Sequence, residues 1–173
     1  MQKQRLHSTR DPIALASLKQ AIGFFAAQAK VLAAAIAALV EHDPVWAALD
    51  SSFRSIKGVA GRTVAVLLAE LPEIGTLSNK AVAKLAGLAP VARQSGQWKG
   101  KSFICGGRAN VRQALYMPAL VAARFNPDLK AKYQQLIAQG KPAKVAITAI
   151  MRKLIVTANA LLKADRLWVK SMA

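Results

Sequence analysis

Acidic residues are scarce in this sequence. Eight aspartates and glutamates stand against 25 lysines and arginines, which gives the 173-residue chain a formal net charge of +17. Self-repulsion of this size is tolerated where a polyanion neutralises it, so nucleic acid is the first class of partner to consider. An anionic membrane surface is a weaker alternative. A soluble basic protein without a polyanionic partner is the third interpretation that the charge leaves open.

Cysteine and histidine are nearly absent as well. The single cysteine, Cys105, excludes an internal disulfide and a cysteine-cluster metal site, and it fits a reducing cytosol. The two histidines, His7 and His42, lie far in the sequence from the candidate nucleophile considered below. Glu70 and Glu73 flank a proline turn, where we expect both to face solvent, and the carboxylates suggest no two-metal site. We therefore expect no metal or cofactor within this chain.

Long apolar runs and a signal peptide are lacking too. The start, MQKQRLHSTRDP, has no apolar segment after its basic residues. The longest apolar run, VLAAAIAALV from Val31, is half of a membrane span, so we expect no transmembrane helix and no membrane partner. Aromatic residues make up 6% of the chain, whereas 54% of it is hydrophobic. This balance favours helices packed through alanine, leucine, valine and isoleucine, and hence an all-α fold.

A long helix is predicted from Asp11-Pro12 to about Glu41. Apolar residues recur along it with an unbroken spacing of three and four, which is typical of a coiled-coil seam. The seam consists of Leu15, Leu18, Ile22, Phe25, Ala29, Leu32, Ile36 and Leu39. Self-association through this helix and packing against another helix of the same chain are both compatible with the pattern. We divide the chain into an oligomerisation helix, residues 1–42, and a helical domain, residues 43–173.

Capping residues and helix breakers divide the helical domain. Asp43-Pro44 and Asn126-Pro127 each combine a capping side chain with a proline at the first helical position, and Ser78 is a further N-cap. Pro118 is expected to kink or divide the helix that begins near Ala109. The predicted helices cover about residues 43–55, 62–71, 79–86, 109–125, 126–140 and 141–163, with short β pairing around 98–104.

A glycine-containing turn, IKGVAGRT at residues 56–63, lies between two of these helices. Its pattern resembles a helix-hairpin-helix, in which glycines let the backbone approach a phosphate and the N–H groups of the following helix bind the anion. Gly58 and Gly61 would permit this approach, and Arg62 would add charge. The same pattern is typical of a plain turn between helices, and that interpretation stays open.

No carboxylate occurs between Ile74 and Pro127. A solvated face normally mixes charges of both signs, so a stretch of one sign suits a phosphate backbone. Its cations are Lys80, Lys84, Arg93, Lys99, Lys101, Arg108, Arg112 and Arg124. Trp98 and Phe103 in the same stretch either stack on bases or anchor the segment to the core.

The centre of this stretch, RQSGQWKGKSFICGGR at residues 93–108, carries a serine followed by a glycine, Ser95-Gly96. A serine nucleophile for phosphoryl transfer needs exposure, cations that stabilise the scissile phosphate, and a base or metal. Arg93 and Lys99 lie close by, but no base lies near in the sequence. By themselves these residues favour a turn role for Ser95 over a nucleophilic one.

Four stretches taken together resemble one bacterial transposase family. They are IKGVAGRTVAVLLAELPEIG, KLAGLAPVARQSGQWKGK, ICGGRANVRQALYMPALVAARFNP and GKPAKVAITAIMRKLIVTANALL. They look like the C-terminal domain of the DEDD-type insertion-sequence transposases, which are guided by a bridge RNA and related to the Piv and MooV DNA invertases. The resemblance covers residues 10–165, and its most specific part runs from the Ser-Gly pair through the Gly-Gly-Arg to the following helix.

The resemblance implies a role for each part of the chain. Ser95 would attack a DNA phosphate and form a covalent phosphoserine intermediate. A RuvC-like domain, absent from this chain, would carry Mg²⁺ and complete the active centre. The heptad seam would mediate homo-oligomerisation, the partners would be DNA and a guide RNA, and the protein would act at the nucleoid in the bacterial cytoplasm. The residues expected to contact nucleic acid are Gly58, Gly61, Arg62, Arg93, Gly96, Trp98, Lys99, Lys101, Arg108 and Arg112.

The sequence departs from the family pattern at several points. Lys57 and Ala60 stand where the family has proline and a second glycine, which weakens the predicted phosphate contact of the hairpin. Cys105 stands at a position that is commonly small or glycine, where we expect a buried thiol. Without the metal domain we expect binding and self-association, but no strand transfer by this chain alone. The alternatives are a non-catalytic basic helix-hairpin-helix nucleic-acid-binding module and a coiled-coil scaffold.

Overall fold

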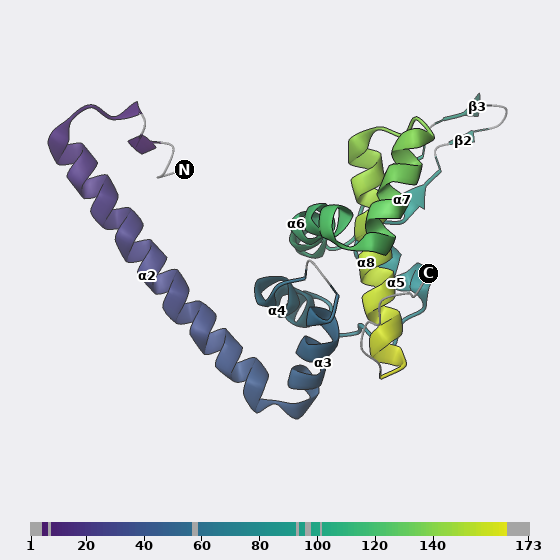
Figure 1. Ribbon diagram of the computed structural model, residues 1–173, viewed down its shortest axis with the longest axis horizontal. Helices are drawn as coiled ribbons and strands as arrows, with labels where there is room; N and C mark the ends of the chain where they lie inside the picture. The colour runs from purple at the N-terminus through teal and green to yellow at the C-terminus, as the bar shows by residue number, and fades with distance from the viewer. Residues whose placement is uncertain are drawn as a thin grey trace. The chain divides into compact units, whose positions relative to one another are not determined.

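The computed structural model describes residues 5–6, 8–56, 59–92, 94–95, 98–100 and 102–165. The chain divides into two compact units, Met1–His42 and Asp43–Ala173, and each is described by itself. Helices make up most of the described residues, and the strands are only two residues long each. The predicted all-α fold is therefore confirmed (Figure 1).

The first unit consists chiefly of one long helix, α2, from Pro12 to His42. Its start is capped as predicted, because the backbone N–H of Ala14 donates to Asp11 Oδ1 at 2.8 Å. None of its residues is buried, and seam residues such as Leu32 and Leu39 expose 63% and 66% of their surface. The apolar seam therefore has no cover in this unit.

Among the described residues, two helices, α2 and α8 (Ala143–Lys163), are long and apolar enough to cross a membrane by length and composition. The core helix of a soluble protein passes the same test, and α8 has 44% of its apolar window buried inside the second unit. In α2 that share is 0%. The expectation that the chain has no membrane partner stays a prediction.

The second unit contains the remaining helices, and their starts follow the predicted caps. Asp43 Oδ1 accepts from the N–H of Trp46 at 3.2 Å, Ser78 Oγ from Ala81 at 3.2 Å, and Asn126 Oδ1 from Leu129 at 3.3 Å. The helices are α3 (Pro44–Arg54), α4 (Gly61–Glu70), α5 (Asn79–Leu85), α6 (Ala109–Phe125), α7 (Pro127–Ala138) and α8 (Ala143–Lys163).

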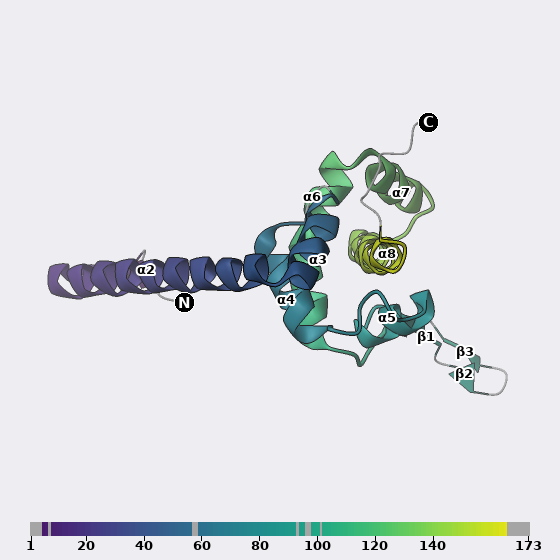
Figure 2. The same ribbon diagram turned by 90° about the horizontal axis from the view of Figure 1, so that it is seen from below.

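Helix α8 is the centre of the core. It packs against α3, α5, α6 and α7, and Figure 2, which views it end-on, shows it between α5 and α7. Ile150 and Ile155 of α8 are fully buried, as are Ala119 and Ala122 of α6. The small alanine side chains let α6 approach α8 closely, which produces the tight helix packing that the alanine-rich composition predicts.

Helix α6 runs unbroken through Pro118, so of the two predicted effects, a kink or a division of the helix, the division does not occur. Proline removes one backbone donor and crowds the preceding turn. Pro118 is buried together with its neighbour Ala119, so the ring contributes to the core. Packing of the ring therefore offsets the lost hydrogen bond.

The strands form an arm, residues 90–104, between α5 and α6. At its base β1 (Pro90–Val91) pairs antiparallel with β4 (Phe103–Ile104). Toward its tip β2 (Gln94–Ser95) pairs with β3 (Trp98–Lys99), with Ser95 opposite Trp98. The predicted β pairing around 98–104 is confirmed, and in Figures 1 and 2 the tip stands clear of the helices.

Candidate functional site

Ser95 lies in the outer part of the arm as the second residue of β2. It is exposed, and none of the described residues forms a hydrogen bond with its hydroxyl. A short antiparallel pair presents the side chain without burying it, so the first requirement for a nucleophile, access to a large substrate, is met. No base within the described part of the chain contacts the hydroxyl.

Several of the predicted contact residues fall outside what the structure describes. Gly58, Arg93, Gly96 and Lys101 lie outside the described residues. Trp98 and Lys99 are placed as strand β3 through their backbone alone. On the same arm Phe103 is 46% exposed, so its ring is not buried in the core.

The predicted hairpin can be described from its second half, where α4 begins at Gly61. Ala60 precedes it as N-cap without a side-chain hydrogen bond, and Arg62 is exposed in the first turn. A Cβ on Gly61 would lie 2.6 Å from Arg54 Nη2, so the guanidinium of Arg54 covers this glycine. Arg54 also pairs with Asp50 at 2.6 Å. Arg54 was not predicted as a contact residue, because Arg54 precedes the glycine pattern in the sequence.

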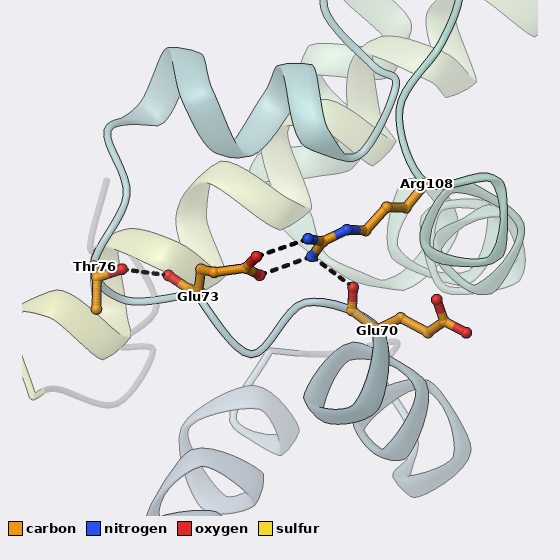
Figure 3. Close-up of polar contacts among 4 residues, drawn as sticks. All are labelled: Glu70, Glu73, Thr76 and Arg108. Carbon is orange, nitrogen blue, oxygen red and sulfur yellow. Dashed lines mark hydrogen bonds and ion pairs between the residues drawn. The ribbon is translucent and has the colours of Figure 1, made fainter.

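Arg108 has an intramolecular partner, which the charge pattern did not indicate (Figure 3). Its Nη1 and Nη2 donate to the two carboxylate oxygens of Glu73, each at 2.7 Å, and Nη1 also donates to the backbone carbonyl of Glu70 at 2.8 Å. Such a bidentate pair is among the stronger polar contacts of proteins. The expectation that Glu70 and Glu73 simply face solvent is wrong: the Glu70 carboxylate accepts from Asn110 Nδ2 at 2.8 Å.

The hydrogen bonds from Arg108 hold the pKa of Glu73 at about 2, well below its ordinary 4.5. The bond from the hydroxyl of Thr76 goes to the Glu73 backbone carbonyl, at 2.7 Å, and fixes the same turn (Figure 3). The carboxylate in turn raises the pKa of Arg108, so both groups stay charged. The pair is partly exposed, with 34% and 41% of the two side chains accessible.

Acid should weaken this ion pair in a definable window. A carboxyl group whose pKa is depressed by folding adds stability that is complete above its unfolded pKa and is lost below it. For Glu73 that loss runs from pH 4.5 down to about 2. We expect the free energies of unfolding of the wild type and of Glu73→Gln to differ at neutral pH and to converge as the pH falls through this window. Urea denaturation across the range tests this, and a constant difference would contradict it.

The backbone after the arm packs unusually closely on the end of α5. The N–H of Arg108 donates to the carbonyl of Leu85 at 2.7 Å, and a Cβ on Gly107 would lie 2.2 Å from Gly87 N. Arg112 Nη1 donates to the Gly106 carbonyl at 2.9 Å. Two glycines facing each other therefore let two backbones touch, and the Gly-Gly-Arg motif has a packing role that its composition did not predict.

Cys105, one residue before this contact, is exposed. The expectation of a buried thiol is wrong, because residues 105–107 run along the surface between β4 and α6. Among the described residues no group of three histidine, cysteine, aspartate or glutamate side chains is placed to hold a metal ion.

Exposed cations lie on the two helices that precede and follow the arm in the sequence. Lys80 and Lys84 are exposed on α5, and Arg124 is exposed at the end of α6. The four carboxylates nearest the one-sign stretch in sequence are Glu70, Glu73, Asp128 and Asp50, and three of them have a named polar partner. Positive charge therefore dominates among the described residues of the stretch that contains the arm.

Comparison with known proteins identifies the stretch that carries these features. Residues 50–134, which include α4, α5, the arm and α6, match the model of the Transposase IS116/IS110/IS902 family. This stretch is therefore similar to the transposase domain of that family. It contains Ser95, the Arg108–Glu73 pair and the two facing glycines.

Three relatives extend this result. The chain is 33% identical over 121 residues to the pilin gene-inverting proteins of Moraxella bovis and of Moraxella lacunata, which covers 67% of this chain and 37% of each relative. It is 29% identical over 153 residues to the insertion element IS110 uncharacterized 43.6 kDa protein of Streptomyces coelicolor, which covers 87% of this chain and 37% of the relative. The chain thus matches little more than a third of the length of these relatives.

Proposed function

We propose that this chain is the serine-bearing, DNA-binding part of a DNA transposase or site-specific recombinase. The observation that carries the proposal is the exposed Ser95 on the arm, in a basic stretch without carboxylates that matches the transposase family. The pilin gene-inverting proteins invert a gene by name, and they are 33% identical to this chain over 121 residues. A DNA segment is then the substrate.

In the proposed reaction the Ser95 oxygen attacks a phosphorus atom of the DNA backbone. An O–P bond to serine forms while the P–O bond to the departing strand breaks. The serine proton goes to a base outside this chain, and the departing strand end takes up a proton as it leaves. The DNA backbone stays linked to the protein through phosphoserine. The hydroxyl oxygen of another strand end later attacks the same phosphorus atom and loses its proton. This forms a new P–O bond and breaks the O–P bond to serine, whose oxygen takes up a proton. No net hydrolysis occurs, so the DNA is joined again.

The rest of the active centre belongs to a second domain in this proposal. A RuvC-like domain with Mg²⁺ would stabilise negative charge on the phosphate. Among the described residues of this chain, no group of three histidine, cysteine, aspartate or glutamate side chains is placed to hold such an ion. This chain holds the DNA backbone through Arg62, Lys80 and Lys84, together with arm cations. A guide RNA and a second copy of the chain, joined through α2, complete the proposed assembly in the cytoplasm at the nucleoid.

A matched pair of serines tests the proposed nucleophile. Ser95 and Ser102 are both exposed on the arm. In a full-length protein in which this chain replaces the matching segment of the Streptomyces coelicolor relative, supplied with DNA substrates, guide RNA and Mg²⁺, we expect Ser95→Ala to abolish a covalent protein–DNA adduct. Ser102→Ala should leave the adduct on a denaturing gel. Removing the nucleophile of an enzyme lowers its rate by several orders of magnitude.

Two outcomes would oppose the proposal. An adduct that persists in Ser95→Ala places the nucleophile elsewhere. Strand exchange without any adduct, together with DNA binding that weakens steeply with salt, would support the alternative of a non-catalytic nucleic-acid-binding module. That alternative is favoured by one observation, the lack of a base beside Ser95 among the described residues.

A further inference from the structure

The arm depends on its base for its direction. It leaves the helical unit at Pro90 and returns at Ile104, and the pairing at its base, β1 with β4, joins only two residues of each strand. A two-stranded ladder of this length is marginal by itself. The contacts that follow β4 therefore decide where the arm, and Ser95 with it, is held.

Those contacts converge on Arg108. Its guanidinium reaches the end of α4 at the Glu70 carbonyl and the α4–α5 turn at the Glu73 carboxylate, while its backbone N–H bonds to Leu85 at the end of α5. Figure 3 shows the side chain extending from the start of α6 toward both glutamates. Arg108, the N-cap residue of α6, thus joins the start of this helix to the end of α4, the α4–α5 turn and the end of α5.

The charges argue against a phosphate contact at Arg108. At least three of its five N–H donors are used within the protein, and Glu73 neutralises the guanidinium at 2.7 Å. A DNA phosphate would have to displace a carboxylate that is held by two parallel hydrogen bonds, and the carboxylate would then repel it. Arg112 is committed in a similar way, to the Gly106 carbonyl.

We infer that Arg108, with Glu73 as its partner, is a positioning residue for the arm and not a phosphate ligand. The pair clamps the start of α6 to the α4–α5 turn and so fixes the path of the segment that ends the arm. Its consequence for chemistry at Ser95 rests on the function proposed above, whereas the order of the arm is a property of this chain alone.

The direction in which two substitutions change DNA affinity distinguishes a clamp from a phosphate contact. Glu73→Gln removes a negative charge and frees the Arg108 side chain. If Arg108 binds a phosphate, this variant should therefore bind duplex DNA more tightly than the wild type. The Arg108→Gln variant should then bind duplex DNA more weakly. For a clamp both variants release the arm, so both should weaken DNA binding. We expect weaker binding from both variants, with a loss of about tenfold for Arg108→Gln, which also removes the bond to the Glu70 carbonyl. Fluorescence anisotropy with a labelled duplex measures it.

Hydrogen exchange of the arm is the independent measurement. In the 173-residue chain without DNA, we expect amide exchange over residues 90–104 to accelerate about tenfold in Glu73→Gln and in Arg108→Gln. The double variant should match Arg108→Gln, because that substitution already removes the contact with Glu73 together with the bond to the Glu70 carbonyl. Arg124→Gln, the loss of an exposed cation away from the pair, should leave the exchange unchanged. Hydrogen exchange in α8 reports whether each variant is still folded. Arg108→Lys is a milder replacement, because it keeps the positive charge but cannot donate two parallel hydrogen bonds to a carboxylate.

The outcomes are distinguishable from those for the proposed function. Unchanged exchange over the arm in both folded variants, or tighter DNA binding by Glu73→Gln, would overturn the clamp even if Ser95 forms an adduct. Faster exchange with a parallel loss of binding supports the clamp even if no adduct is ever found, in which case only the catalytic proposal fails.

Discussion

Replacing Gly107 with alanine is expected to destabilise the second unit by more than about 4 kcal/mol, a loss that single substitutions rarely reach. The added Cβ would lie 2.2 Å from Gly87 N, 2.5 Å from Gly87 Cα and 2.6 Å from the Leu85 carbonyl oxygen. All three are backbone atoms, so no side chain can rotate out of the way. Accommodation requires the arm and α6 to separate from α5.

The neighbouring glycine supplies the control for this prediction. Gly106 has nearly the same backbone angle, with φ of 65° against 68° for Gly107, but a Cβ there meets nothing within 4 Å. Gly106→Ala should therefore cost only the left-handed conformation itself, about 1–2 kcal/mol. Urea denaturation of the two variants measures the difference. If both variants lose the same free energy of unfolding, the left-handed backbone conformation, and not the contact with Gly87, is the reason for glycine at both positions.

Replacing Leu32 with lysine is expected to abolish the proposed self-association of α2. Leu32 belongs to the predicted seam and is 63% exposed in this unit, so an oligomer would bury it. Each buried leucine contributes about 1.5–3 kcal/mol, and a dimer loses two, which corresponds to a hundredfold or greater rise in Kd. Sedimentation velocity over a range of protein concentrations measures the change.

The control lies on the opposite face of the same helix. Ala34 is exposed and outside the seam, so Ala34→Lys adds the same charge without touching a coiled-coil interface. An oligomer that survives both substitutions, or a wild type that stays monomeric at all concentrations, would rule out the seam as the interface. Binding of the wild type to lipid vesicles would favour the membrane alternative that the length and hydropathy of α2 allow.

The sequence predicted the features that depend on residues near each other in the chain. Capping by Asp11, Ser78 and Asn126 involves a side chain and an N–H three residues later, so each cap is encoded within one short segment. The strands of the arm are equally local. Fold class and most helix boundaries follow from such patterns, which is why they could be predicted.

The candidate site could be predicted only in part. Arg108 and Glu73 are 35 residues apart, and the run without carboxylates that singled out Arg108 as a DNA contact begins one residue after Glu73. Counting charge along the chain therefore cannot show that the first carboxylate outside the run folds back onto a cation inside it. Gly87 and Gly107 meet for the same reason, through tertiary packing. The burial of Pro118 likewise follows from neighbours on other helices.

The partial exposure of the Arg108–Glu73 pair bears on how the protein is handled. Basic proteins that bind nucleic acid are commonly stripped of it with concentrated salt, and at about 1 M the screening length falls to about 3 Å. The side chains of the pair are 34% and 41% accessible, and a partly exposed ion pair is weakened by salt. A buffer that frees the protein of bound polyanion will therefore also loosen the attachment of the arm. Preparations should be returned to low ionic strength before the arm is studied.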